Sequence, residues 1–280
     1  LGRVLRGGDF TRTVFNTLIR GKDKPTSRAS HAGFRVVLEI PVRTEPNTST
    51  AETKSLPPNL QQGLVAYYPF NGNTQDESGN GHHSTTTVEP VFTSDRHGNS
   101  NRAYNFVSTK STITIADHND FDLGTGPDRQ VTISLWFNRS IRDGYIIKKL
   151  DSKKKGTSSN IDYQLHVRLD ESNAVLHLLW ATGPSTVNGG SLYAYTGIRQ
   201  LSESAPWHHV AVNYRQGDIG TKEIFLDGEV AYRSNSGKKN QASDQPVRIS
   251  ALQGSIDDIR IYNRALSEAE VKALYEFEKP

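Results

Sequence analysis

The stretch Gly254-Ser255-Ile256-Asp257-Asp258-Ile259-Arg260-Ile261-Tyr262-Asn263-Arg264-Ala265-Leu266-Ser267 decides the fold class of this 280-residue chain. Residues 254–262 alternate small or apolar residues with polar ones, and three isoleucines add β-branched weight, so the segment predicts a strand. Ser267 precedes Glu270 at the spacing of a capping box, which predicts a short helix directly after the turn. A strand, a turn and one closing helix are typical of the end of a β domain.

The rest of the long C-terminal part has the same character, because short apolar segments alternate with turn residues. Asp227-Gly228 between two such segments is the strongest hairpin signal. Many short strands and one convincing helix predict an all-β, two-sheet antiparallel sandwich. The expected strands are 64–70, 103–107, 111–116, 131–138, 145–148, 162–169, 174–180, 207–214, 223–226, 229–233, 248–251 and 254–262.

Three segments carry a family resemblance. They are the closing stretch quoted above, Pro206-Trp207-His208-His209-Val210-Ala211-Val212, and the opening Gly63-Leu-Val-Ala-Tyr-Tyr-Pro-Phe70-Asn71-Gly72-Asn73-Thr74-Gln75-Asp76-Glu77-Ser78-Gly79-Asn80-Gly81-His82. Residues 63–277 resemble the laminin-G-like, concanavalin-A-like jellyroll (LamG) modules of bacterial secreted and surface proteins. The resemblance implies a jellyroll with a short C-terminal helix, an extracellular or cell-surface location, and ligand binding without chemistry.

The beginning of the chain has a different composition and predicts a separate part. Residues 44–62 are rich in Thr, Ser and Pro with few large apolar residues, which predicts a linker. Residues 63–280 are then the LamG-like jellyroll domain. Before the linker, residues 1–43 contain two expected strands, at 2–10 and 31–38. About 40 residues cannot form a stable core without disulfides or a metal.

Residues 1–40 resemble the C-terminal end of the formylglycine-generating, sulfatase-modifying enzymes, in the Arg-Gly-Gly-Asp-Phe10 strand and the Gly33-Phe-Arg-Val-Val37 strand. Enzymes of that family use cysteines near this motif, and this chain has none, so the resemblance carries no activity here. We therefore expect residues 1–43 to be the remnant of an upstream domain of the same polypeptide. The absence of methionine is in line with this, because Leu1 is then not a translation start.

Composition excludes several functions. The lack of cysteine excludes disulfides, thiol catalysis and zinc–thiolate sites. Nowhere does the sequence reach the roughly 18 consecutive apolar residues of a membrane span, so no membrane insertion is predicted. The excess positive charge lies in residues 1–43, where the arginines are scattered without interleaved aromatic residues. We therefore predict no binding to nucleic acid.

The loop after the first strand of the domain is a candidate for structural calcium. Asn71, Asn73 and Asp76 supply the oxygen atoms that Ca²⁺ prefers, and neighbouring glycines allow sharp turns. The family resemblance places this loop beside the last strand, where Asp257 could add a carboxylate. The alternative is a loop closed by its own side-chain-to-backbone hydrogen bonds.

Aromatic residues are the candidates for ligand binding. Alternation in 131–138 places Ile133, Leu135 and Phe137 on one face and Thr132, Ser134 and Trp136 on the other. The second face is the binding face in such folds or is covered by loops. Aromatic rings stack on sugar rings, so the predicted ligand-binding residues are Trp136, Trp180, Tyr193 and Tyr195. The alternative is that each of these rings belongs to the core.

No catalytic pattern is evident, and the chain is predicted not to be an enzyme. Related glycosidases need two carboxylates about 5 Å apart on one cleft. Glu223, Asp227 and Glu229 include a turn residue, and Asp257 and Asp258 are expected on opposite faces of their strand. Three hypotheses remain: a carbohydrate- or glycoconjugate-binding module, a protein–protein adhesion module for a cell-surface protein, or an accessory domain of a larger enzyme of the sulfatase-modifying type.

Overall fold

The computed structural model describes residues 3–6, 20–23, 55–108, 110–122, 129–138, 144–151, 160–170, 175–184, 193–199, 207–216, 220–235, 243–250 and 253–280. Its contacts divide the chain into two units, Leu1–Ser55 and Leu56–Pro280. In the described residues, no helix combines the length and the apolar character that crossing a membrane requires.

The first unit contains one antiparallel pair of strands, β1 (Arg3–Arg6) and β2 (Arg20–Asp23). β1 lies within the strand expected at 2–10. β2 falls in a polar segment where no strand was expected. The other expected strand, at 31–38, lies outside the described residues. The resemblance of this unit to sulfatase-modifying enzymes, and its status as a remnant, stay predictions.

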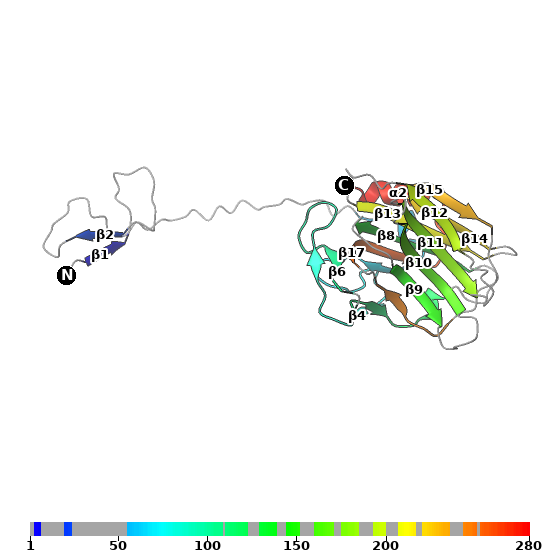
Figure 1. The fold of residues 1–280 in the computed structure, drawn as a ribbon, viewed down its shortest axis with the longest axis horizontal. Helices are drawn as coiled ribbons and strands as arrows, with labels where there is room; N and C mark the ends of the chain where they lie inside the picture. Colours follow the sequence, from blue (N-terminus) through cyan, green and yellow to red (C-terminus); the bar gives the residue numbers. More distant parts are fainter. Residues whose placement is uncertain are drawn as a thin grey trace. The chain divides into compact units, whose positions relative to one another are not determined.

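The second unit is a sandwich of two antiparallel sheets, as predicted (Figure 1). One sheet has seven strands in the order β12-β11-β10-β9-β16-β7-β4. Their bounds are β4 Ser84–Thr86, β7 Ile113–Ile115, β9 Gly144–Asp151, β10 Asn160–Asp170, β11 Val175–Pro184, β12 Tyr193–Arg199 and β16 Val247–Ile249.

The other sheet has eight strands in the order β15-β14-β13-β8-β17-β6-β5, with β3 also paired to β17. Their bounds are β3 Leu64–Tyr68, β5 Phe92–Thr93, β6 Ala103–Phe106, β8 Gln130–Asn138, β13 Trp207–Arg215, β14 Thr221–Leu226, β15 Glu229–Ser234 and β17 Gly254–Tyr262. The helices are α1 Pro58–Gln61, the 3-10 turn η1 Asn119–Phe121 and α2 Glu268–Glu278.

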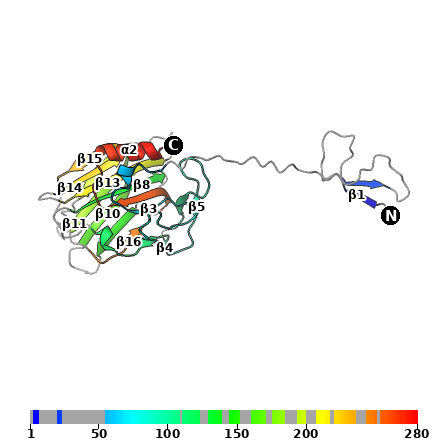
Figure 2. The ribbon, with the colours of Figure 1, turned by 180° about the vertical axis from the view of Figure 1, so that it is seen from behind.

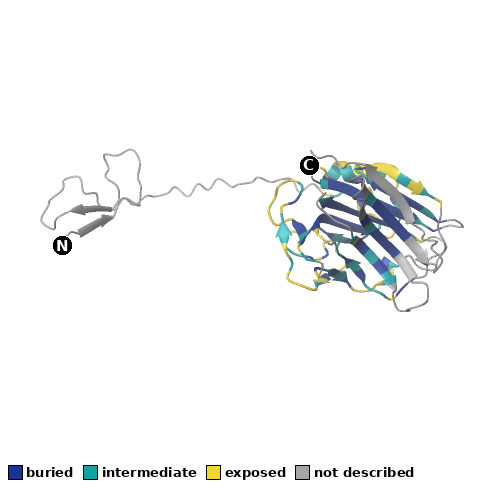
Figure 3. Ribbon diagram, viewed as in Figure 1, coloured by how far each residue is buried: buried dark blue, intermediate teal, exposed yellow. Residues whose placement is uncertain are grey.

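The main core lies between the two sheets, where the strands are largely buried (Figure 3). Ile133 of β8 pairs with Val212 of β13 on one side and with Ile261 of β17 on the other. All three side chains are buried in this core, which confirms the predicted alternation in 131–138. Each such aliphatic side chain contributes about 1.5–3 kcal/mol through burial.

In the second unit most predicted strands are confirmed, and three of its strands, β4, β5 and β12, were not predicted from the sequence. β4 is Ser-Thr-Thr and β5 has two residues, so neither offers an apolar period to detect. β12 contains Tyr193 and Tyr195, in a segment for which the sequence predicts ligand-binding side chains but no strand. The hairpin at Asp227-Gly228 is confirmed, and both residues have the positive φ (49° and 81°) that its tight turn requires.

The helix α2 covers the outer face of the eight-stranded sheet, the face that points away from the main core (Figure 2). Its capping box is confirmed, because Ser267 N donates to Glu270 Oε2 at 2.8 Å and Ser267 Oγ accepts from Glu270 N. A second apolar cluster joins the helix to the sheet. It consists of Leu60, Ala211, Phe225, Tyr262, Leu266, Val271 and Leu274.

Leu60 corrects the expected boundary of the domain. Residues 44–62 were predicted to be a linker, but α1 lies in this range and Leu60 has 0% exposure in the second cluster. Arg264 also donates hydrogen bonds to the carbonyls of Asn59 and Gln62. The last part of the expected linker is therefore integral to the folded unit, because the buried Leu60 and the hydrogen bonds from Arg264 hold it there.

Two truncations test this boundary. A chain that lacks residues 1–55 should unfold in urea with the same midpoint as the full chain. A chain that lacks residues 1–62 should lose roughly 2–4 kcal/mol, because it no longer contains the buried leucine. Tryptophan fluorescence follows both transitions. Equal stability of the two truncated chains would contradict the assignment of α1 to the domain.

Candidate functional site

β17 departs from regular alternation at Asp257 and Asp258. Its pairing with β8 shifts register between Asp257 and Arg260, and Asp258 has a φ of 48°. Arg96 therefore reaches both carboxylates, with nitrogen–oxygen distances of 2.8 Å to Asp257 and 2.7 Å to Asp258. The expectation that the two aspartates lie on opposite faces is wrong, because this bulge adds one residue and turns both to the same side.

These groups belong to a buried ion cluster, which consists of Arg96, Asp257, Asp258, Arg260 and Glu278. Arg260 is ion-paired with Glu278 of α2, and its guanidinium also lies 3.9 Å from the centroid of the Tyr67 ring. Trp136 Nε1 donates to Glu278 Oε2 at 2.8 Å, and Tyr67 Oη donates to Asp258 Oδ1 at 2.5 Å. The cluster thus joins β17, β8, β3 and α2.

The cluster contains two guanidinium groups and three carboxyl groups, all nearly without solvent contact. Burial, and then the charge of Asp258, raise the pKa of Asp257. Burial also pushes up the pKa of Asp258, but Arg260 and Arg96 outweigh it and hold that pKa below its usual value. A proton on Asp257 makes the buried cluster neutral, which is the arrangement with the lowest desolvation cost.

Two of the four predicted ligand-binding aromatics are buried. Trp136 has 2% exposure, stacks on Tyr275 of α2 at 5.7 Å and lies 4.7 Å below the guanidinium of Arg96. Trp180 has 0% exposure in the main core, and its Nε1 donates to the carbonyl of Asn213 at 3.1 Å. The assignment of Trp136 and Trp180 to a sugar-binding surface is therefore wrong.

The other two predicted aromatics, Tyr193 and Tyr195, lie on β12, whose backbone pairs with Ala181 and Leu179 of β11. Their side chains are outside the described part of the structure. Their role in ligand binding stays a prediction.

The four predicted calcium ligands have separate partners. Asn73 Oδ1 accepts from Gln75 N at 2.8 Å, and Asn71 Oδ1 accepts from Arg102 at 3.1 Å. Asp257 is bound by Arg96. The carboxylate of Asp76 accepts hydrogen bonds from Tyr67 N, Ser78 N, Ser78 Oγ and His82 N, each at 2.9 Å. These donors outweigh burial, which raises the pKa of Asp76, and leave that pKa below its usual value.

The donor set does not fit a calcium site shared by Asn71, Asn73, Asp76 and Asp257, because the oxygens of Asp76 are turned toward N–H and O–H donors. It fits the alternative, a loop closed by its own hydrogen bonds.

The candidate acid–base carboxylates are also engaged. Glu223 accepts hydrogen bonds from Asn213, Arg215 and Arg233 at 3.0, 2.5 and 2.7 Å. Burial raises the pKa of Glu223, but these bonds outweigh it and lower the pKa overall. Asp227 binds His208 Nδ1 at 2.8 Å in its turn. Glycoside hydrolysis requires an acid with a raised pKa, and Glu223 has the opposite property.

One nucleophile–base pair occurs in the described residues, but it has no access to solvent. Ser134 Oγ and His209 Nε2 are 2.8 Å apart, and both residues have 0% exposure beneath α2. Glu278 lies 4.0 Å from the same Nε2, whereas the acid of a catalytic triad binds the other imidazole nitrogen. Burial lowers the pKa of His209 to about 3, so this imidazole is neutral near pH 7. The pair is structural.

The outer face of the seven-stranded sheet, by contrast, carries polar side chains that no helix covers in the described residues. Strand pairing aligns Thr85, Thr114, Arg248 and Lys148 in one row across β4, β7, β16 and β9, which we call the basic row. Thr85 is exposed and the other three are half-buried. The strand neighbours of Thr114 and Arg248 are buried in the main core, and so is Ile147 before Lys148, which places these three side chains on the opposite, outer face.

An aromatic side chain lies beside the basic row. Tyr145 is 38% exposed, and its ring stacks on the imidazole of His166 with a centroid distance of 4.6 Å. Lys148 Nζ lies 4.9 Å from the centroid of the Tyr145 ring. Burial, followed by the charge of Arg248, lowers the pKa of Lys148. Among the residues that the structure describes, no carboxylate forms an ion pair with Lys148 or Arg248.

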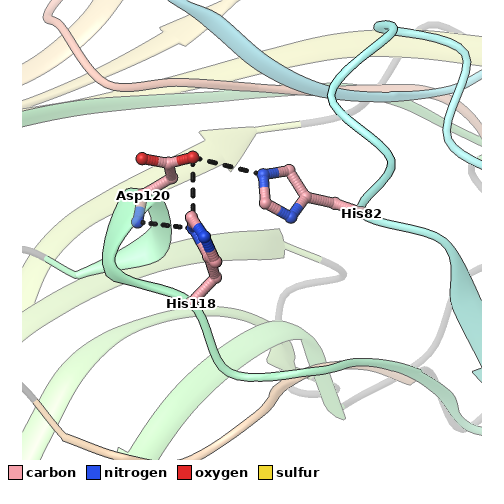
Figure 4. Close-up of side chains that lie close together, drawn as sticks. All are labelled: His82, His118 and Asp120. Carbon is pink, nitrogen blue, oxygen red and sulfur yellow. Dashed lines mark hydrogen bonds and ion pairs between the residues drawn. The ribbon is translucent and has the colours of Figure 1, made fainter.

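A third group of side chains, His82, His118 and Asp120, lies near the start of η1 (Figure 4). Neither this group nor the basic row was predicted from the sequence. The possible signals were two short segments that combine histidine with carboxylates, 76–83 and 117–122, but their approach depends on the fold.

Comparison with known proteins agrees with the fold. A family described as the concanavalin A-like lectin/glucanases superfamily (Laminin_G_3) matches residues 107–272. A search of curated proteins finds no match. Solved structures similar to this chain include the binding domain of Paraclostridial Mosquitocidal Protein 1, with 14% identity and a TM-score of 0.56 over 77% of this chain and 52% of that one.

The binding domain of botulinum neurotoxin serotype C1 is similar at 11% identity, with a TM-score of 0.57 over 79% of this chain and 53% of that one. A botulinum neurotoxin type C structure, whose cell entry is described as dependent upon interaction with two ganglioside molecules, has 12% identity and a TM-score of 0.55 over 78% and 52%. The chain thus spans about half the length of these chains. At such identities the likeness concerns the fold alone.

The buried imidazole of His209 predicts a pH dependence of stability. Its pKa is about 3 in the folded chain and about 6.5 when unfolded, so between these values the unfolded state binds one more proton. The contribution of His209 to the unfolding free energy therefore falls as the pH falls, by about 1.4 kcal/mol per pH unit well below pH 6.5. Urea unfolding between pH 4 and 6 gives the unfolding free energies of the wild type and of His209→Gln. The advantage of the wild type over the variant should shrink as the pH falls. Unfolding free energies of the two proteins that run parallel across this pH range would contradict the prediction.

Proposed function

Because the chain belongs to the concanavalin A-like lectin/glucanases superfamily, we propose that it is a non-catalytic recognition module that binds glycans or glycoconjugates. We place the binding surface on the outer face of the seven-stranded sheet, at the basic row and Tyr145. An extracellular or cell-surface location follows from this role and is part of the proposal. The ligand is then a glycan, free or carried by a cell-surface protein or lipid.

One observation carries the proposal. Lys148 and Arg248 lie side by side on a half-buried surface without a carboxylate partner in the described residues, and burial, followed by repulsion from Arg248, lowers the pKa of the lysine. A bound anion would relieve this repulsion. Charge-assisted hydrogen bonds to an oxyanion are about twice as strong as those between neutral groups. The surface is therefore suited to glycans that carry carboxylate or sulfate groups.

The neighbouring ring supplies the second element of sugar recognition. Tyr145 exposes part of a ring whose position is held by stacking on His166. Aromatic faces pack against the C–H faces of sugar rings, while flanking polar groups give direction. Thr114 and Thr85 add hydroxyl groups along the same row. Gangliosides, named for one of the similar structures, are acidic glycolipids, and their chemistry agrees with a cationic surface beside an aromatic ring.

The outer face of the eight-stranded sheet is a poor candidate for the binding surface, which supports placing the site on the seven-stranded sheet. Its outer face is closed by α2 and by the buried ion cluster, so Trp136 and the Ser134–His209 pair cannot reach a ligand. The candidate carboxylates for hydrolysis all have partners: Glu223 is bound by two arginines, Asp227 by His208 and Glu229 by Lys272. These contacts support recognition without catalysis.

A protein partner is the alternative. Among the described residues, the large apolar side chains with most exposure are Val88, Val91, Val107, Tyr145 and Val230. Four of these five side chains are valines, which expose little apolar area each, whereas a protein interface needs a large continuous apolar patch. The observations therefore favour the glycan.

A glycan array probed with the full chain tests the proposal. We expect binding to acidic glycans that weakens with rising salt, because screening acts on exposed charges. Lys148→Gln/Arg248→Gln should reduce the affinity at least about tenfold, since each charged hydrogen bond contributes about 1.5–3 kcal/mol. Lys272→Gln/Lys279→Gln, which removes the same charge from α2 and its C-cap, should bind as the wild type does.

Equal losses of glycan affinity in the two double variants would contradict the placement of the binding site on the basic row. Absence of all glycan binding, together with saturable binding to a cell-surface protein, would replace the glycan with the protein partner.

A further inference from the structure

Two imidazoles and one carboxylate converge at η1, from the segments that precede β4 and follow β7. His82 follows the loop after β3, His118 precedes η1, and Asp120 belongs to η1. Their ligand atoms all lie within 4.8 Å of one another, and in Figure 4 the three side chains point toward a common centre. Among the described residues, this is the group of histidine and acidic side chains whose geometry could hold a metal ion.

The distances match those between ligands of one metal ion. Asp120 Oδ2 lies 3.2 Å from His82 Nε2 and 3.1 Å from His118 Nδ1. Zinc binds imidazole nitrogen and carboxylate oxygen at about 2.0–2.2 Å, so the edge of a tetrahedron of such ligands is roughly 3.3 Å. Both distances are close to this edge. A small opening of the group would admit the ion.

The backbone of His82 is held on both sides. Its N–H donates to Asp76 Oδ2 at 2.9 Å, and its carbonyl accepts from Tyr68 Oη at 2.6 Å. The imidazole also packs edge-on against Phe121 at 4.7 Å. The hydrogen-bonded loop around Asp76 thus positions the first ligand before any ion arrives. Such preorganisation reduces the entropy lost on binding.

Of the three aspartates around η1, only Asp120 is available to bind a metal ion, because the other two are paired with a lysine. Asp117 and Asp122, on either side of η1, are both ion-paired with the buried Lys149, the second at 2.9 Å. Asp120 instead faces the two imidazoles. His118 Nδ1 accepts from the N–H of Asp120 at 3.2 Å, and a metal ion would replace this contact. The released N–H lies at an exposed position and can bind water.

We propose that His82, His118 and Asp120 form a binding site for a divalent transition-metal ion of the zinc class. Two imidazoles with one carboxylate suit Zn²⁺ and its neighbours, whereas Ca²⁺ takes oxygen ligands almost exclusively. The side chains of His118 and Asp120 are 53% and 43% exposed, so the ion has a route from solvent. The fourth position is open to water or to a ligand group. The proposal does not depend on the glycan surface.

Calorimetric titration of the full chain, purified in EDTA and then freed of it, tests the site with Zn²⁺ and Co²⁺. We expect one ion per chain with micromolar or tighter affinity. Bound Co²⁺ should show the visible absorption of a tetrahedral site. A titration with Ca²⁺ should show no competition with Zn²⁺. Absence of saturable one-to-one Zn²⁺ binding would overturn the proposal.

Substitutions of the proposed ligands test whether the metal ion binds at this position. His118→Ala and Asp120→Asn change exposed side chains, so the fold should remain, as far-UV circular dichroism would check. Each should weaken Zn²⁺ binding by more than about tenfold, because even residues that only orient a ligand contribute 10–100-fold. His97→Ala removes an exposed imidazole elsewhere and should have no effect. Unchanged affinity in His118→Ala, or an equal loss in His97→Ala, would contradict the site.

Discussion

Arg96 and Arg260 share three carboxyl groups beneath α2, and the arrangement of the whole domain depends on this contact. Removing several charges from water costs several kcal/mol for each ion, so such a group is tolerated only when charges and hydrogen bonds are matched. The bulge at Asp258 makes the match possible, because it turns both aspartates toward Arg96. Glu278 then holds the end of α2 on the sheet through Arg260 and Trp136.

The consequence for function is an asymmetry between the two sheets. α2 and the ion cluster cover the outer face of the eight-stranded sheet. The aromatic and polar side chains on that face are therefore buried. The outer face of the seven-stranded sheet keeps cations without carboxylate partners in the described residues, next to a partly exposed tyrosine. The proposed recognition surface therefore lies on the outer face of the seven-stranded sheet.

Local signals predicted much of the fold. The capping box at Ser267 and the hairpin at Asp227-Gly228 are decided within a few residues, and alternation placed Trp136 on the correct face of β8. What covers that face could not be predicted, because the cover comes from residues 268–278 of the same chain. The bulge was also missed, since two adjacent aspartates give no period that distinguishes a bulge from a regular strand. The basic row joins residues about a hundred positions apart through strand pairing, and the histidine group needs a loop and a turn to meet.

Urea unfolding of Glu278→Ala beside Glu276→Ala tests most directly whether the buried ion cluster holds α2 on the sheet. Both changes remove a glutamate from the last turns of the helix, but Glu278 is 3% exposed, whereas the side chain of Glu276 is 47% exposed and paired only with Lys279 in the described contacts. The loss of Glu278 takes from Arg260 its nearest carboxylate and from the indole N–H of Trp136 its acceptor, and should lower the unfolding free energy by about 3 kcal/mol. Glu276→Ala should change it by no more than about 0.5 kcal/mol. Equal, small effects of the two substitutions would contradict the dependence of the fold on this cluster.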